Sequence, residues 1–311
     1  MTLSKRHLLS IADLTPGDVA LIFQTAKSLK EISRRPVKKV PTLRGKTVIN
    51  CFFEPSTRTR TSFEIAAKRL SADAVNFGST GSALAKGESL IDTIRTLNAM
   101  QPDALVIRHR GSGVPALCAA QVRDCAVINA GDGQHEHPTQ ALLDAFTVAQ
   151  AKGRVRGLTV AFLGDIAHSR VARSGIALFR KLGAKVLVAG PRSLLPVAVE
   201  ALGAAAMPSI AEAVALADVL VVLRVQLERL QGAGVPTLRE YARHFGLNAV
   251  TMKQAKPDVV IMHPGPINRG VEIDPELADG RYSLILDQVE NGIAVRMACL
   301  YLYCHERLLH H

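Results

Sequence analysis

The chain has 311 residues, 48% hydrophobic and 21% charged, which is a globular composition long enough for two domains. No apolar run is long enough to cross a bilayer and the first residues lack the pattern of a secretory signal, so we expect no membrane association. A net charge of +11 favours small anionic partners or a well-solvated basic surface. Nucleic acid is disfavoured because aromatic residues are only 4% and tryptophan is absent.

Cysteine usage indicates the compartment. The five cysteines are scattered and never spaced as CxxC, which favours buried thiols in a reducing compartment over a disulfide framework or a zinc site. His135 and His137 form a pair without further ligands at useful spacing, so we expect no metal. The cytoplasm is the expected location.

The elements alternate along the chain between short β-branched runs and helical periods. This alternation predicts an α/β fold of two domains, each a parallel sheet flanked by helices. The predicted strands are 47–53, 74–77, 104–108, 126–129, 159–163, 185–189, 219–223, 259–262 and 283–286. The predicted helices include 57–70, 89–98, 139–152, 171–182 and 210–216.

The domain division follows from a polar, glycine-bearing stretch at 151–157 after a long helix. We expect a first domain at 1–137, a linking helix at 138–150 and a second domain at 151–290. A C-terminal helix within 291–311 is long enough to pack back on the first domain.

The first chemical motif is Ser56-Thr57-Arg58-Thr59, which stands where a helix begins after a strand. A helix N-terminus attracts anions, three hydroxyls add hydrogen bonds, and arginine matches phosphate oxygens. An ordinary capped helix is the alternative, but such a start does not need a further arginine and threonine. The motif therefore predicts a phosphate site.

A second motif, His137-Pro138-Thr139-Gln140, opens the linking helix. His137 can donate a hydrogen bond to a carbonyl oxygen and stabilise developing negative charge, and Gln140 lies one turn later. The alternative is a loop histidine bonded to backbone.

Further polar groups stand at strand ends, where open α/β sheets bind ligands. Arg108, Arg170 and Arg224 each follow or end a predicted strand or strand–loop unit, and His263-Pro264-Gly265-Pro266 forms a rigid turn after another. Lys86 lies in a small glycine-flanked loop with Ser82, which by itself is typical of a solvated mobile loop.

Several common enzyme motifs are missing. Gly-x-Ser-x-Gly, GxGxxG and GxxxxGK[ST] do not occur, which argues against α/β-hydrolases and against dinucleotide or nucleotide triphosphate enzymes. What remains is a site rich in arginine and hydroxyls for two anions. Such a site suits a transfer reaction driven by positioning and electrostatics, without a cofactor.

Taken in order, these motifs resemble the aspartate carbamoyltransferase family over nearly the whole chain. Segment 52–64 and His137–Gln140 mark carbamoyltransferases in general, and Arg224-Val225-Gln226 with His263–Pro266 points to the aspartate branch. The resemblance implies transfer of a carbamoyl group from carbamoyl phosphate to L-aspartate, in de novo pyrimidine biosynthesis.

The resemblance also implies residue roles. The carbamoyl phosphate site would comprise Ser56, Thr57, Arg58, Thr59, Arg108, His137, Gln140 and the carbonyls of Gly265 and Pro266. Among these, Arg58, Thr59, Arg108 and His137 would be catalytic. Aspartate would be bound by Lys86, Arg170, Arg224 and Gln226.

Family members share sites across a trimer interface, so Ser82 and Lys86 would enter from a neighbouring subunit of a homotrimer. Glu54, Arg170 and Arg229 match family positions that bridge the domains on closure. Whether the trimer joins regulatory or dihydroorotase-like chains is left open by the sequence.

Two rival functions remain. Ornithine carbamoyltransferases share the phosphate half, but typically carry His-Cys-Leu-Pro where this chain has His263-Pro264-Gly265-Pro266. A basic nucleic-acid-binding or non-catalytic scaffold is the other, and the intact set of site residues argues against it.

Overall fold

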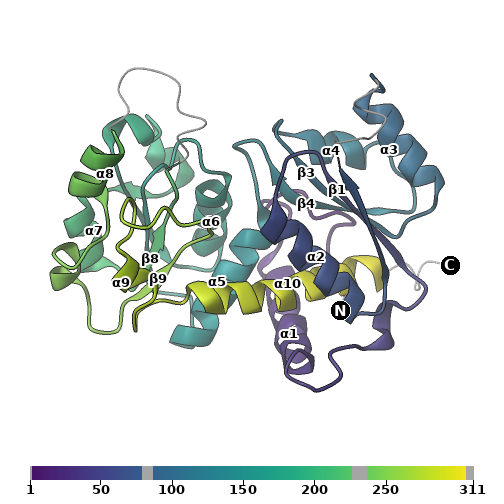
Figure 1. Ribbon diagram of the computed structural model, residues 1–311, viewed down its shortest axis with the longest axis horizontal. Coiled ribbons are helices and arrows are strands. Elements are labelled where there is room, and N and C mark those ends of the chain that lie inside the picture. The colour runs from purple at the N-terminus through teal and green to yellow at the C-terminus, as the bar shows by residue number, and fades with distance from the viewer. Residues whose placement is uncertain (1, 79–86, 226–236, 306–311) are drawn as a thin grey trace. The chain divides into compact units, whose positions relative to one another are not determined.

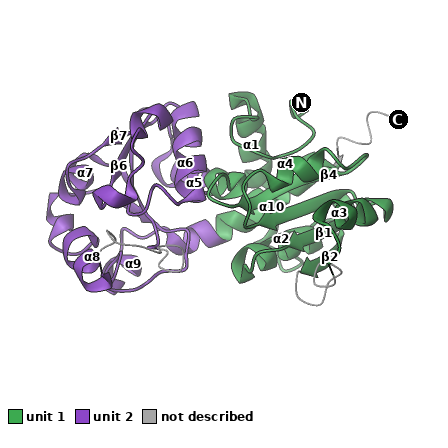
Figure 2. Cartoon of the chain, turned by 90° about the horizontal axis from the view of Figure 1, so that it is seen from above, with its two compact units in different colours: residues 1–143, 290–311 green, residues 144–289 purple. Residues whose placement is uncertain are grey.

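The computed structural model describes residues 2–78, 87–225 and 237–305 (Figure 1). It comprises two compact units, residues 1–143 with 290–311 and residues 144–289, coloured separately in Figure 2. The chain enters the second unit within helix α5 (Pro138–Lys152) and returns to the first within helix α10 (Ile285–His305). The first unit is therefore built from two stretches of sequence.

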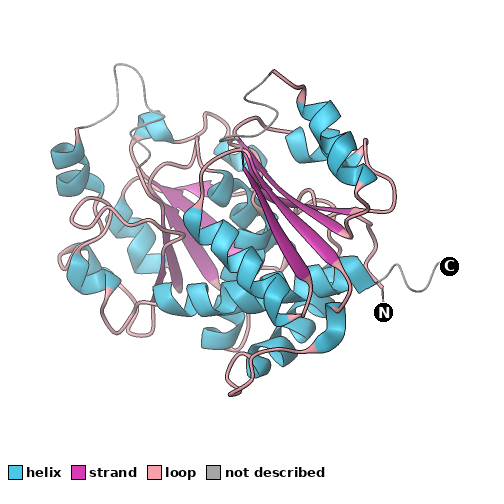
Figure 3. Ribbon diagram, turned by 45° about the vertical axis from the view of Figure 1, so that its right-hand side comes forward, coloured by secondary structure: helices cyan, strands magenta, loops and turns pink. Residues whose placement is uncertain are grey.

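The first unit is a four-stranded sheet with the strand order β2-β1-β3-β4, in which every pairing is parallel. Its core contains buried aliphatic and thiol side chains from the sheet and from helices α3 and α4. The strands appear in magenta in Figure 3. Bounds of these elements are α1 Pro16–Ile32, β1 Thr47–Phe52, α2 Thr57–Arg69, β2 Asp73–Gly78, α3 Leu90–Ala99, β3 Ala104–His109, α4 Val114–Ala119 and β4 Ala126–Asp132.

The second unit is a five-stranded sheet, also parallel throughout, with the order β7-β6-β5-β8-β9. Its central strands β5 and β8 are buried except for Thr159 at the start of β5, as near-continuous apolar runs predict for a sheet covered on both faces. The bounds are β5 Thr159–Leu163, α6 Arg170–Lys181, β6 Lys185–Ala189, β7 Ala205–Ala206, α7 Ile210–Leu216, β8 Val219–Val222, α8 Leu238–Phe245, β9 Val260–Met262 and α9 Pro275–Ala278.

Short 3-10 helices complete the described connections, at Pro41–Leu43, Arg192–Leu194, Val199–Leu202 and Thr251–Gln254. None of the helices in the described part of the chain is both long and apolar enough to cross a membrane. The architecture confirms the predicted fold class of two parallel sheets flanked by helices.

One predicted strand, 283–286, is wrong. Ser283 forms only an isolated bridge with Ile261, and the helix α10 begins at Ile285, six residues before the predicted start at 291. Leu284 N–H still donates to Ile261 O at 2.8 Å, after which the chain turns into the helix. A short apolar run cannot be told from a helix start by periodicity, which explains the error.

Candidate active site

In the first unit, the predicted site residues lie near the point where the strand order reverses. From β1 the chain crosses to β2 on one side, and from β3 it crosses to β4 on the other, so the loops after β1 and β3 diverge. Phe52 pairs in register with Arg108, and Phe53 N–H donates to Arg108 O at 2.9 Å. Arg108 therefore lies beside the end of the strand that leads to Ser56.

The start of α2 has the features of an anion site. Ser56 occupies the N-cap position, but its side chain makes no capping hydrogen bond within the part of the chain that the structure describes. The amides of the first turn have no partner within a helix. Thr57 and Arg58 are exposed, whereas Thr59 is buried with 8% exposure. One helix start thus combines backbone donors, three hydroxyl side chains and an arginine.

The Arg108 side chain is held from two sides. Nη1 donates to Ala130 O at 3.1 Å, and Nε lies 3.8 Å from Glu54 Oε2. Both charged side chains are largely buried, 13% and 17% exposed, which strengthens their attraction relative to a surface pair. These contacts orient the guanidinium at the strand end.

His137 and Gln140 lie beyond β4, at the carboxyl edge of the same sheet. His137 is 4% exposed and Gln140 is 8% exposed. Gln140 N–H donates to His137 O at 3.0 Å in the first turn of α5. The two predicted site residues are therefore presented by one helix start.

A buried carboxylate that the sequence did not single out shapes this loop. Asp132 Oδ2 accepts from Gly113 N–H at 2.6 Å, and Oδ1 accepts from Glu136 N–H at 3.0 Å and from Asn129 Nδ2 at 2.9 Å. Asp132 is 1% exposed. It fixes the backbone immediately before His137. Its only sequence signal is the Gly131-Asp132-Gly133 context, which also suits an ordinary turn.

The second unit repeats this plan. β5 connects to β6 on one side and β8 connects to β9 on the other, so the switch point lies between β5 and β8. Arg170 opens α6 and is 5% exposed. Ser169 caps that helix by accepting from Ala172 N–H at 3.1 Å. Arg170 is thereby placed at the switch point of the second sheet.

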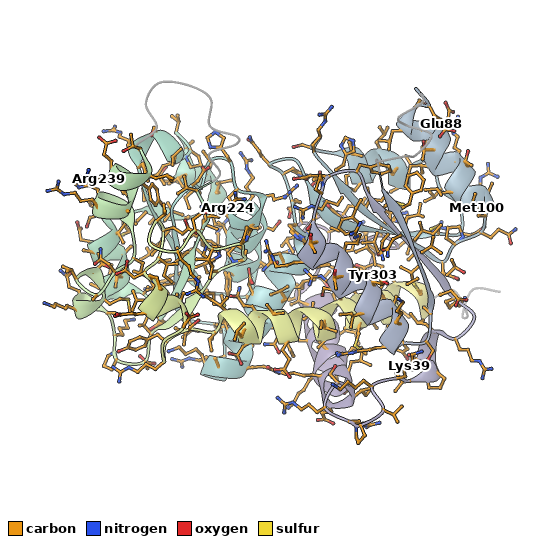
Figure 4. All side chains as sticks on the ribbon, in the orientation of Figure 1. Lys39, Glu88, Met100, Arg224, Arg239 and Tyr303 are labelled. Atoms are coloured by element: carbon orange, nitrogen blue, oxygen red, sulfur yellow. The ribbon has the colours of Figure 1, made fainter. Side chains whose placement is uncertain are left out.

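Arg224 lies on the other side of that switch point. It follows β8 by two residues and is half-buried, and its side chain is shown with the others in Figure 4. Leu223 N–H donates to Leu163 O at 2.8 Å, which continues the β5–β8 pairing beyond the strand. Arg224 therefore follows the end of β8, and Arg170 opens the helix that follows the adjacent strand β5.

Gly265 and Pro266 form the turn after β9. Gly265 has φ +66°, and the peptide bond between the two residues is cis. His263 Nδ1 accepts from Gly265 N–H at 2.8 Å. The turn thus lies at the same carboxyl edge as Arg224, because β8 and β9 pair in parallel.

Some predicted residues lie outside the described part of the chain: Ser82, Lys86, Gln226 and Arg229. Within the described ranges, no group of three or more histidine, cysteine, aspartate or glutamate side chains is placed to hold a metal ion. Each unit, taken by itself, has arginine residues at the carboxyl edge of its own sheet.

Comparison with known families gives matches to both units. Residues 6–150 match the model of the aspartate/ornithine carbamoyltransferase carbamoyl-P binding domain, and residues 156–303 match the Asp/Orn binding domain. The aspartate carbamoyltransferase catalytic subunit of Sorangium cellulosum is 60% identical over 301 residues, covering 97% of this chain and 94% of the relative.

Solved structures agree with this similarity. Aspartate transcarbamoylase from Trypanosoma cruzi, in complex with carbamoyl phosphate and aspartate, is 30% identical with a TM-score of 0.86, covering 95% of each chain. Ornithine carbamoyltransferase from Thermus thermophilus is 26% identical with a TM-score of 0.84, covering 96% of this chain and 99% of that one. The fold alone therefore does not separate the two branches.

Proposed function

Because the chain belongs to the aspartate/ornithine carbamoyltransferase family, we propose that it transfers the carbamoyl group of carbamoyl phosphate to the amine of L-aspartate. The products are N-carbamoyl-L-aspartate and phosphate, and the reaction is an early step of de novo pyrimidine biosynthesis. The observation that carries the choice of acceptor is the 60% identity, over 97% of this chain, to an aspartate carbamoyltransferase catalytic subunit.

Carbamoyl phosphate is assigned to the first unit. Its phosphate is bound by the backbone amides at the start of α2 and by the hydroxyls of Ser56, Thr57 and Thr59. Arg58 and Arg108 are its charged partners. The support is the N-cap serine that makes no capping bond and the oriented Arg108 beside the end of β1. In this assignment residues 1–137, with 291–311, form the carbamoyl phosphate domain, and 138–150 link it to the aspartate domain at 151–290.

The carbamoyl group itself is held by both polar and backbone groups. His137, Thr59 and Arg108 donate toward its carbonyl oxygen, and Gln140 with the carbonyls of Gly265 and Pro266 accepts from its NH₂. Donors aimed at a developing oxyanion lower the barrier most when they are already fixed before reaction. The Asp132 hydrogen bonds that fix the loop before His137 support this role.

Aspartate is assigned to the arginines of the second unit. Arg170 binds the α-carboxylate, Arg224 and Gln226 bind the side-chain carboxylate, and Lys86 contributes from a neighbouring subunit. A dicarboxylate needs cationic partners, and two arginines at one switch point supply them. Ornithine has an α-carboxylate but a cationic side chain, so it does not need the second arginine.

The reaction requires no cofactor. The amine nitrogen of aspartate attacks the carbonyl carbon, a C–N bond forms, and the C–O bond to phosphate breaks. The amine loses a proton, which the departing phosphate accepts. The protein's contribution is to hold the two anionic substrates together and to stabilise charge on the carbonyl oxygen.

The assembly proposed is a homotrimer with shared active sites, in which Ser82 and Lys86 of one subunit enter the site of the next. Whether regulatory or dihydroorotase-like chains join it is left open. We place the enzyme in the cytoplasm, supported by five buried thiols that suit a reducing compartment.

An assay with carbamoyl phosphate and either aspartate or ornithine tests the function. We expect N-carbamoyl-L-aspartate and stoichiometric phosphate with aspartate, and no product with ornithine. Product with ornithine alone, or with neither acceptor, would overturn the proposal.

A further inference from the structure

A buried histidine–glutamate pair lies directly behind the turn that carries Gly265. The side chains of His263 and Glu272 are both 0% exposed, and His263 Nε2 lies 3.2 Å from Glu272 Oε1. Burying two ionisable side chains is costly unless hydrogen bonds satisfy them. The neighbouring hydrogen bonds therefore determine what the pair does.

The roles of the ring nitrogens follow from the backbone. Gly265 N–H can only donate, and it lies 2.8 Å from His263 Nδ1, so this nitrogen must accept. A neutral imidazole then carries its proton on Nε2 and donates to Glu272 Oε1. The glutamate thereby holds the histidine in the one tautomer that can fix the Gly265 amide.

The same carboxylate oxygen reaches a second strand end. Glu272 Oε1 also accepts from Asn268 N–H at 2.6 Å, and Asn268 Nδ2 donates to Val225 O at 3.3 Å. Val225 directly follows Arg224. One oxygen atom thus supports both the turn after β9 and the backbone after β8.

The other carboxylate oxygen behaves differently. In the described part of the chain Glu272 Oε2 is buried and has no hydrogen-bond partner. Buried polar atoms are almost always satisfied, and an unsatisfied one costs free energy. The hydrogen bonds that the structure shows for this carboxylate are therefore all on Oε1, the atom that contacts His263 and Asn268.

We propose that Glu272 is a positioning residue for carbamoyl transfer. Acting through His263 and Asn268, it sets the Gly265–Pro266 carbonyls and the Arg224 strand end in one fixed relation. The inference rests on the proposed function, because those carbonyls and Arg224 are the groups assigned to the carbamoyl NH₂ and to aspartate. Glu272 itself touches neither substrate.

Kinetics of Glu272→Ala and Glu272→Gln test the proposal. Misplaced binding groups cost about 10- to 100-fold in rate, so Glu272→Ala should raise KM for aspartate about tenfold and lower kcat about tenfold or more. Inhibition by inorganic phosphate, which probes the first unit, should not change. Glu272→Gln keeps an acceptor oxygen for both donors and should recover most of the loss.

The matched control is Asp279→Asn. It removes the exposed ion pair with Arg269, whose contacts are 2.6 and 2.8 Å, from the same stretch of chain without touching the turn. Its kinetics should equal those of the wild type. The proposal is overturned if Glu272→Ala leaves KM for aspartate unchanged, or if Glu272→Gln is as impaired as Glu272→Ala.

A second readout does not depend on activity or on the alanine variant folding. Imidazole ¹⁵N NMR of the wild-type protein, with His263 assigned by difference from His263→Asn, should show the Nε2–H tautomer. An Nδ1–H tautomer would overturn the positioning role even if the enzyme is active. Absence of carbamoyl transfer in the wild type would instead overturn the proposed function, so the two failures are distinguishable.

Discussion

Arg58 is exposed at the start of α2, so its contribution to folding is small while its proposed contribution to phosphate binding is large. Exposed substitutions usually change the free energy of unfolding by less than about 0.5 kcal/mol. Loss of a charge that stabilises a transition state costs on the order of 10²- to 10³-fold in kcat. We expect Arg58→Ala to lower kcat/KM by at least about 100-fold, with an unchanged melting temperature.

Arg60 offers the control, because it is also an exposed arginine on α2, two residues further along. Arg60→Ala should retain most of the activity in the same steady-state assay. Wild-type turnover in Arg58→Ala would remove this residue from the site.

His109 gives a pH dependence of stability. Burial, and then the charge of Arg110, lower the pKa of His109, and Gly111 N–H donates to its Nδ1 at 2.8 Å. The folded pKa lies below the unfolded value of about 6.5, so the unfolded chain binds more protons in the window beneath that value. The stabilising contribution is therefore complete above about pH 6.5 and is lost as pH falls through the folded pKa.

Asn at this position can keep an oxygen acceptor for the Gly111 amide without titrating. We expect the melting temperature of His109→Asn to fall less steeply than that of the wild type between about pH 7 and pH 5. Parallel melting curves against pH in the two proteins would contradict this assignment.

The roles proposed for Ser56, Arg108 and Arg224 could be put forward from the sequence residue by residue, because hydroxyl and guanidinium side chains are themselves anion-binding groups. Asp132 and Glu272 could not. Their partners, which include backbone amides, are brought to them only by the folded chain, and a single carboxylate in a turn has many ordinary explanations.

At the scale of elements, the β5–α6 connection depends on a glycine. Gly164 has φ +119°, and a Cβ built there would meet Tyr241 Oη at 2.9 Å and Leu223 O at 3.0 Å. Leu223 precedes Arg224, so a shift at this contact moves the strand end that leads to Arg224, which is proposed to bind aspartate. A residue with a side chain forced into this region costs about 1–3 kcal/mol before any clash.

Gly157→Ala is the matched comparison, because Gly157 has φ +79° and nothing within 4 Å of a built Cβ. We expect Gly157→Ala to destabilise by about 1 kcal/mol and to keep its aspartate kinetics. Gly164→Ala should destabilise more and raise KM for aspartate. Equal effects in chemical denaturation and kinetics would contradict the role of the close contact.

How well an element could be predicted from the sequence depends on how it is packed in the fold. Central strands such as 159–163 match the structure at both ends, because buried parallel strands are continuous apolar runs bounded by polar turns. Helix α1 is missing from the predicted elements, although Thr15 and Asp18 form a capping box at its start. The apolar run at 283–286 was wrongly predicted as a strand, because its conformation depends on its neighbours β9 and α10.

Over the whole molecule, the five cysteines report on global unfolding. All are buried, and burial raises the pKa of Cys118 and of Cys299 to about 12. Thiolates are the reactive species, so a native chain should react negligibly with a disulfide reagent near about pH 8. We expect no rapid thiol in the native protein and five after denaturation. Rapid reaction of any thiol in the native enzyme would show local opening.

The fold class could be predicted from the sequence because alternating strand and helix signals restrict the topology to parallel sheets. The division into two compact units was harder to locate. It falls within α5 and α10, where the chain stays helical and the sequence has no turn signal.

That discontinuous first unit has a consequence for synthesis. Residues 290–305 supply Arg296, whose Nη1 donates to Ser62 Oγ at 2.7 Å and whose guanidinium lies 5.3 Å from the centre of the Phe63 ring. A ribosome makes the whole of 144–289 before this segment, which at about 5–20 residues per second takes on the order of 10–30 s. The second unit can therefore fold while the first still waits for its last helix. Proteolysis of chains arrested shortly after residue 289 should cut the first unit and spare the second; equal protection of both would show that the first folds without its closing segment.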